Sequence, residues 1–210
     1  MTKKIRFFII LLVIIFIGII SLNFYFKTPS SKYLIDENTT VKDFFPKETM
    51  VKEFSGGYED QECYYTIDKI DKDKLQMKAF DTLTQEKQAL VLQASEDSIK
   101  ILSIKVEYDG KFDEDYLESV KPNCNQILLK APLKVGTHWN ETLDTEYKIT
   151  GINVKTKTPA GSFYTVEVTV FSDGVEEGKI YYAKGLGTVK KVFKKFEGTG
   201  EETLVKVEYK

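Results

Sequence analysis

The sequence has very little arginine and histidine, and this shortage excludes several kinds of functional site. Arg6 is the only arginine of the 210 residues, so the rest of the chain lacks the planar guanidinium that binds phosphate or carboxylate bidentately. His138 is the only histidine, so a site with several histidine ligands is excluded and His-dependent catalysis would have to use this residue. The sequence contains no Gly-rich phosphate loop, Gly-x-Ser-x-Gly or His-Glu-x-x-His motif. We therefore predict that the protein is not an enzyme.

Cysteine is also scarce, because the chain contains only Cys63 and Cys124. In an oxidising compartment the two could form a disulfide, closing a loop of about 60 residues and stabilising the fold by roughly 4 kcal/mol. Two separate thiols fit the sequence equally well, since sequence does not show whether their Cα atoms lie within ~4.4–6.8 Å of each other.

The one long hydrophobic run of the chain lies at its N-terminus. Sixteen of the twenty residues Phe7–Phe26 are Leu, Ile, Val or Phe. A transmembrane helix needs about 20 apolar residues, and sixteen such side chains favour insertion by roughly −5 to −10 kcal/mol. Lys3, Lys4 and Arg6 precede the run, and the positive-inside rule keeps such an end in the cytoplasm. The pattern predicts a single-pass anchor in the lipid bilayer of the cell membrane.

A cleaved signal peptide is the alternative interpretation of this segment. Its apolar core usually has about 7–15 residues and ends at a small-residue cleavage site, whereas this core is longer and its last residues and exit are Leu22–Lys27. An uncleaved anchor is therefore the preferred interpretation. We expect residues 1–6 to be a cytoplasmic tail, 7–26 the anchor, 27–40 a polar linker, and 41–210 an extracytoplasmic β domain.

The net charge of the chain differs between its two parts. Residues 27–210 contain 27 lysines and 32 acidic residues, a formal charge of 27 − 32 = −5, whereas the N-terminal tail is positive. An acidic exported domain does not bind nucleic acid without sequence preference, nor an anionic polymer. We accordingly expect no nucleic-acid partner.

Beyond residue 60, apolar and polar residues alternate in short runs that are separated by turn residues. Alternation at period two, with many Val, Ile, Tyr, Phe and Thr residues, is typical of antiparallel strands. The sequence predicts a mainly β fold, in which a meander of about ten strands forms a barrel or half-barrel. The expected strands are 61–70, 74–80, 87–94, 99–108, 147–154, 163–171, 179–182, 188–196 and 204–209.

One acidic segment is the candidate for a short helix and for a metal site. Residues 113–120 carry acidic side chains in their first turn, as helix N-termini often do. Asp109, Asp113 and Asp115 could supply oxygen ligands to Ca²⁺, although their spacing does not match an EF-hand. A solvated turn explains the cluster equally well, and we predict no cofactor.

Several motifs resemble those of a known family. The chain resembles an uncharacterised family of secreted or membrane-anchored β domains from Gram-positive bacteria. The resemblance lies in the opening residues 43–46 and 54–59 and in the later segments 127–139, 158–163 and 181–190. The resemblance implies an extracytoplasmic location and a β fold, and it brings no established activity. The motifs also suit structural roles: a turn at Gly136 that directs Trp139 into the core, a hairpin turn at 158–161, and a strand, a tight bend and the next strand over 181–188. Asp173 and Gly174 are likewise expected to form a turn.

These observations favour a membrane-anchored extracytoplasmic module that binds a ligand without chemical conversion. If the curved sheet encloses an apolar cavity, the ligand would be a hydrophobic small molecule. A structural or assembly partner in the cell envelope is the alternative, and a hydrolase that depends on His138 is less favoured.

Overall fold

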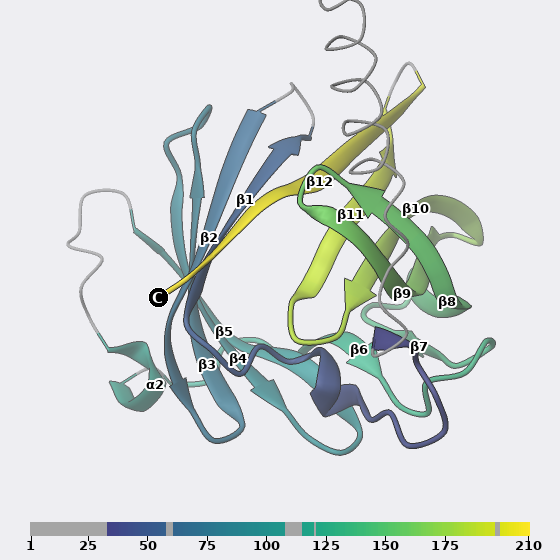
Figure 1. The fold of residues 1–210 in the computed structure, drawn as a ribbon, viewed down its shortest axis with the longest axis horizontal. Coiled ribbons are helices and arrows are strands. Elements are labelled where there is room, and N and C mark those ends of the chain that lie inside the picture. The colour runs from purple at the N-terminus through teal and green to yellow at the C-terminus, as the bar shows by residue number, and fades with distance from the viewer. Residues whose placement is uncertain (1–32, 58–60, 108–114, 120, 196–197) are drawn as a thin grey trace, which may run out of the picture.

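The computed structural model describes residues 33–57, 61–107, 115–119, 121–195 and 198–210, and these residues form one antiparallel sheet of twelve strands (Figure 1). The predicted tail and anchor, including Lys3, Lys4, Arg6 and Phe7–Phe26, lie outside the described residues. No helix in these ranges is long and apolar enough to cross a membrane. The strands are β1 (Met50–Gly56), β2 (Gln61–Asp71), β3 (Lys74–Asp81), β4 (Lys87–Ala94), β5 (Ser98–Glu107), β6 (Gln126–Lys130), β7 (His138–Asn140), β8 (Thr145–Thr158), β9 (Gly161–Ser172), β10 (Val175–Ala183), β11 (Gly187–Lys194) and β12 (Thr199–Tyr209).

The sheet consists of two meanders that meet at β1. The strand order is β6-β5-β4-β3-β2-β1-β12-β11-β10-β9-β8-β7, so the last strand pairs with the first and β6 and β7 are the edges. In Figure 1 the two meanders curve around a shared interior. The edges approach each other, because the indole nitrogen of Trp139 on β7 donates to the carbonyl of Ile127 on β6 at 3.0 Å. The result is a nearly closed barrel.

The mainly β meander expected from the sequence is confirmed, but the expected number of about ten strands was too low. The predicted runs correspond to β2–β5 and β8–β12, but three of them were too short: 147–154 for β8, 179–182 for β10 and 204–209 for β12. Three strands were missed. The strands β6 and β7 have only five and three residues, too few for an alternating pattern to stand out. In β1, Lys52 takes an inward position between Met50 and Phe54 and interrupts the apolar alternation.

Two of the predicted turns show why their residues suit a hairpin. Thr158–Gly161 joins β8 to β9, and Gly161 has a φ of +145°, which glycine adopts readily. Asp173 and Gly174 join β9 to β10 with φ values of 50° and 76°, the positive pair of a tight primed turn.

A short helix covers the outer face of the sheet. Of the helix expected over residues 113–120, the structure describes α2 (Tyr116–Ser119), while residues 113, 114 and 120 lie outside the described residues. Asp115 precedes α2, and its carboxylate accepts from the Leu117 amide at 3.1 Å. Tyr116 is 2% exposed and packs with Ala89 and Val91, which point outward from β4. These outward apolar residues are therefore shielded from water.

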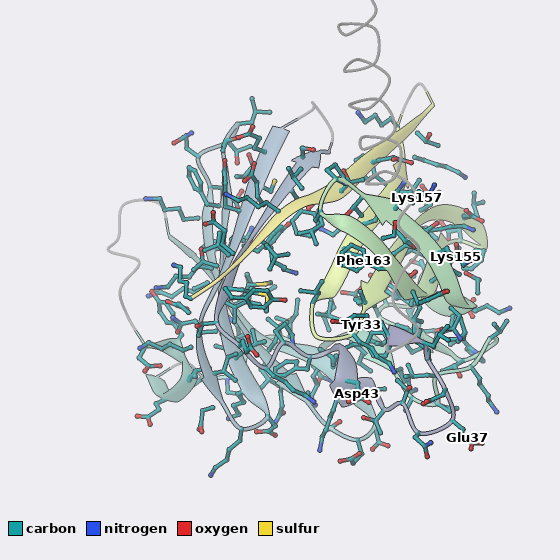
Figure 2. All side chains as sticks on the ribbon, in the orientation of Figure 1. Tyr33, Glu37, Asp43, Lys155, Lys157 and Phe163 are labelled. Carbon is teal, nitrogen blue, oxygen red and sulfur yellow. The ribbon has the colours of Figure 1, made fainter. Side chains whose placement is uncertain are left out.

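The segment before β1 packs against the other meander. Asn153, in β8, accepts from the Ile35 amide at 2.7 Å and donates to the Ile35 carbonyl at 2.8 Å. The segment continues into the 3₁₀ helix η2 (Val41–Phe44), at whose start the Asp43 carboxylate accepts from the Thr40 amide at 2.9 Å. Figure 2 shows Glu37 and Asp43 along the outer edge of the molecule.

Candidate ligand-binding cavity

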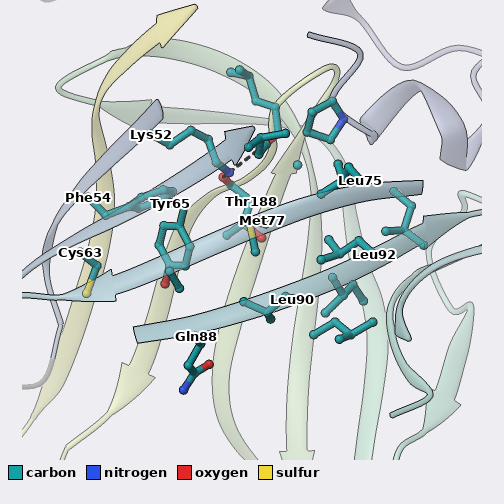
Figure 3. Close-up of a pocket in the computed structure, with 18 of the residues that line it drawn as sticks. Lys52, Phe54, Cys63, Tyr65, Leu75, Met77, Gln88, Leu90, Leu92 and Thr188 are labelled. Atoms are coloured by element: carbon teal, nitrogen blue, oxygen red, sulfur yellow. Dashed lines mark hydrogen bonds between the residues drawn. The ribbon is translucent and has the colours of Figure 1, made fainter. Parts of the chain in front are cut away.

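The interior of the barrel contains a cavity of about 350 Å³. Its wall is mostly apolar, and most of it belongs to strands β1–β5 (Figure 3). The side chains that line it on these strands are Lys52, Phe54, Cys63, Tyr65, Ile67, Leu75, Met77, Ala79, Phe80, Asp81, Gln88, Leu90, Leu92, Ile99 and Ile101.

The alternation of side chains along β3 and β4 creates this wall. Every second residue of a strand points to the same face, and Leu75, Met77 and Ala79 of β3 point inward. The register pairs Met77 with Leu90 and Leu75 with Leu92, so the inward rows of the two strands lie side by side. The same row contains the small Ala79 before it ends at Asp81, and this alanine leaves space that a larger side chain would fill.

The two ends of the cavity differ in polarity and burial. Phe44, Phe45 and Pro46 close one end, and all three are buried. The amide of Gly185 donates to the Asp43 carbonyl at 2.7 Å and thereby fixes this segment to the turn between β10 and β11. At the other end, Asp81, Glu86 and Gln88 are half-buried and form a polar, acidic rim.

A lysine side chain lies inside the apolar wall. Lys52 is 5% exposed, and its Nζ donates to the carbonyls of Leu186 at 3.0 Å and Thr188 at 3.2 Å. Figure 3 shows this side chain reaching from β1 toward Thr188. The Nζ also lies 5.3 Å from the centre of the Phe54 ring, within the range of a cation–π contact. Burial, reinforced by the positive charge of Lys191, lowers the pKa of Lys52 to about 7.

The bend that presents these carbonyls depends on two glycines. Between β10 and β11, Gly185 has a φ of 73° and Gly187 a φ of 66°, values that residues with a Cβ rarely adopt. This confirms the expectation that residues 181–188 form the end of one strand, a tight bend and the start of the next strand. The bend turns the Leu186 and Thr188 carbonyls to the same ammonium group.

A second lysine of the cavity wall has an acidic partner. Lys191 on β11 lies 3.0 Å from the Glu202 carboxylate on β12, and the Tyr65 hydroxyl donates to the same carboxylate at 3.2 Å. Burial alone would lower the pKa of Lys191, but Tyr65 and Glu202 outweigh it and hold that pKa above its ordinary value. Lys191 therefore stays charged and paired at neutral pH.

The two cysteines lie on different parts of the sheet. Cys63 is on β2 and lines the cavity, whereas Cys124 precedes β6 and its amide donates to the Leu102 carbonyl on β5. Strands β3 and β4 separate β2 from β5, and neighbouring strands are about 4.8 Å apart. The structure contains no disulfide between Cys63 and Cys124.

The only histidine lies outside the cavity. His138 is exposed on β7, where its Nδ1 is 3.2 Å from the Gly136 carbonyl oxygen. The neighbouring Trp139 is 4% exposed and stacks on Tyr147 with ring centres 5.6 Å apart. The expected turn at Gly136, which has a φ of 97°, does direct Trp139 into the core.

Only part of the acidic cluster can be placed. Asp109 and Asp113 lie outside the described residues. Asp115 forms an ion pair with Lys69 at 2.6 Å, in addition to its contact with the helix α2. In the described ranges, no group of three or more His, Cys, Asp or Glu side chains could hold a metal ion.

The sequence-based reasoning missed Lys52, Lys191 and Glu202. The sequence did contain a signal for Lys52. In the run Met50–Phe54, Lys52 lies at the alternate position between Met50 and Phe54, two apolar residues that point inward. Nothing in the sequence indicated that Lys191 and Glu202 pair, because their partnership depends on the neighbouring positions of β11 and β12.

Comparisons with known proteins identify no family, and they match three solved structures at low sequence identity. No family model matches the chain, and no curated protein matches it. A solved structure described as an exported protein with a YmcC-like fold, from Bacteroides fragilis, has 13% identity and a TM-score of 0.49, covering 79% of this chain and 98% of its own. A structure described as a lipoprotein, from Parabacteroides distasonis, has 13% identity and a TM-score of 0.44, covering 82% and 100%. A hypothetical protein from Chlamydia trachomatis has 12% identity and a TM-score of 0.34, covering 81% and 93%.

The Gram-positive origin implied by the resemblance stays an expectation. The chemistry of the cavity rests on the residues of this chain.

Proposed function

We propose that the protein is a membrane-anchored extracytoplasmic module that binds a hydrophobic small molecule inside the barrel and does not convert it. The observation that carries the proposal is the cavity of about 350 Å³ with its largely aliphatic and aromatic wall. Small-molecule sites are typically concave and mostly apolar, with a few polar groups, and have volumes of ~300–1,000 Å³. The cavity is at the small end of this range and fits one slender molecule.

The position of the cavity supports a function in binding. A barrel interior is normally filled by side chains, because close packing stabilises the fold. Here the β3 row contains the small Ala79, and the polar end beside it is only half-buried, which gives a ligand a route to the interior. The N-terminal anchor predicted from the sequence would hold this open domain at the membrane surface, where hydrophobic molecules are available.

Binding can be tested with the full-length protein in lipid nanodiscs and the uncharged fluorescent probe N-phenylnaphthylamine. We expect saturable fluorescence enhancement beyond that of empty nanodiscs. The substitution Ala79→Trp fills the cavity and should abolish this component. The matched control Lys87→Trp places the same side chain at an exposed position of β4 and should leave it intact.

Two outcomes would contradict the proposal. One is a wild-type signal that does not exceed that of empty nanodiscs. The other is equal binding by the wild type and the folded Ala79→Trp variant, because the probe would then bind outside the cavity. Circular dichroism of each variant shows that a lost signal reflects a filled cavity and not an unfolded chain.

A further inference from the structure

Lys52 is unusual because its ammonium group is buried in an apolar wall without an acidic partner. Among the described residues, its Nζ forms hydrogen bonds to two backbone carbonyls and no ion pair. An ammonium group has three N–H donors, so one donor is left for a further acceptor. A buried charge is costly unless it is paired, and the free protein therefore holds Lys52 in an unfavourable state.

The neighbouring Lys191 shows how the same barrel satisfies a lysine that has a structural role. Lys191 forms an ion pair with Glu202 at 3.0 Å, and Tyr65 donates to the same carboxylate at 3.2 Å. Glu202 is therefore engaged by two groups. Lys52 points to the same interior, and the charge of Glu202 offsets a small part of the lowering of its pKa by burial. Its own contacts, however, are hydrogen bonds to two carbonyls and the rings of Phe54 and Tyr65.

We infer that the ligand is an amphipathic anion, a hydrocarbon chain with a carboxylate head, and that Lys52 binds the head. This inference rests on the proposed function. The carboxylate would supply the missing counter-ion, and a charge-assisted hydrogen bond in a site of low dielectric is stronger than a neutral one. The hydrocarbon chain would lie against the aliphatic rows of β3 and β4, which include Leu75 and Leu92.

The distribution of charge in the cavity supports an anionic head at Lys52 and not at the rim. Asp81 and Glu86 make the half-buried end acidic, so a carboxylate is repelled there. A cationic head would instead prefer this rim and avoid Lys52. The charge of the head group therefore distinguishes the two orientations.

The titration of Lys52 gives the inference a second readout. The charged or titratable groups around it are Tyr65 on β2, Tyr182 on β10, Lys191 on β11 and Glu202 on β12. Burial raises the pKa of both tyrosines, so they stay neutral below pH 9. The pKa of Lys52 in the empty cavity is about 7, so its positive charge is lost above that pH unless an anion is bound. Carboxylate binding should therefore weaken from pH 7 to pH 9.

The test compares decanoate, decanol and decylamine, which share a chain and differ in charge. The affinity of each compound is measured by its displacement of N-phenylnaphthylamine from the full-length protein in nanodiscs. The same titration with the folded Ala79→Trp variant, whose cavity is filled, measures how much of each compound partitions into the bilayer. We expect decanoate to bind the wild type at pH 6.5 about 10- to 100-fold more tightly than decanol, the effect of one charge-assisted hydrogen bond. Lys52→Met should remove this preference, so that the ratio of decanoate to decanol affinity falls to about one.

The control variant is Lys87→Met, which removes the same charge from the exposed side of β4 and should keep the preference. Between pH 7 and pH 9, decanoate affinity should fall by up to about tenfold per pH unit, whereas decanol affinity stays constant.

The outcomes separate this inference from the proposed function. If the probe does not bind the cavity at all, the proposed function fails. If the probe binds but decanoate and decanol bind equally, or decylamine binds most tightly, the cavity is a binding site and the inference about the anion is wrong. Decanoate preference that persists in Lys52→Met would also overturn it.

Discussion

Inward residues of β8 and β9 are fully buried and lie outside the cavity, whereas those of β2, β3 and β4 face a cavity of about 350 Å³. Ile149, Val166 and Val168 are each 0% exposed, and none of them lines the cavity. On the other wall, Met77 and Ala79 are only partly buried and point into the cavity.

This difference indicates which part of the barrel provides stability and which part is available for function. Dense packing of β-branched and aromatic residues stabilises a core. A cavity and a buried, unpaired ammonium group both lower the stability, and here they occur on the same wall. A natural fold keeps such unfavourable features when a function depends on them. The following predictions test the comparison, in order of decreasing effect.

The largest effect is expected in the packed region, from Trp139→Ala. The substitution removes a buried indole, its stacking on Tyr147 and its hydrogen bond to β6. We expect the free energy of unfolding to fall by about 3–5 kcal/mol, as measured by urea denaturation. A loss below about 1 kcal/mol would show that this region does not anchor the fold.

In the cavity wall, Lys52→Met should stabilise the protein. An apolar side chain of similar length replaces a buried charge, and such changes stabilise by about 1–4 kcal/mol. Urea denaturation at pH 6 measures the difference. Destabilisation of the variant at pH 6 would contradict the assignment of Lys52 as a strained, unpaired group.

The sign of the pH dependence follows from the pKa of Lys52, which is about 7 in the folded protein against 10.5 ordinarily. Below pH 7 both states are protonated, and the folded wild type bears the full cost of the buried charge. Between pH 7 and 10.5 the unfolded chain binds more protons, so the wild type gains stability relative to Lys52→Met as the pH rises. The advantage of the variant should therefore shrink between pH 7 and pH 10.

Enlarging one alanine in each region compares their spare space directly. Ala183 on β10 is 2% exposed and does not line the cavity, so Ala183→Leu should cost about 1–3 kcal/mol through overpacking. The substitution Ala79→Leu extends into the cavity and should cost less than about 1 kcal/mol. Thermal unfolding of both variants measures the difference, and equal costs would contradict the contrast between the two walls.

The smallest effect is expected from His138→Ala, at an exposed position outside both regions. The free energy of unfolding should change by no more than about 0.5 kcal/mol, and N-phenylnaphthylamine binding should stay the same. A loss of probe binding in a folded variant would mean that β7 takes part in the site.

Much of the fold could be predicted, because the inward and outward faces of most strands differ clearly in polarity. The run 87–94 was placed at the observed bounds of β4, and the turn at Asp173 and Gly174 followed from its residue types. The strand β1 was missed because Lys52 occupies a position where the pattern requires an apolar residue. The candidate site could not be predicted, because its walls come from strands far apart in the sequence.

The sequence by itself determined the mainly β fold, the turns, and the scarcity of arginine and histidine that leaves few catalytic options. These properties depend on residue type and on local alternation, which act over a few neighbouring residues. Only the tertiary structure decided that the barrel keeps a cavity, that Lys191 pairs with Glu202, and that Lys52 is buried beside them without an acidic partner. Burial and charge pairing arise from strand register and from the closure of β1 against β12, which no local pattern contains.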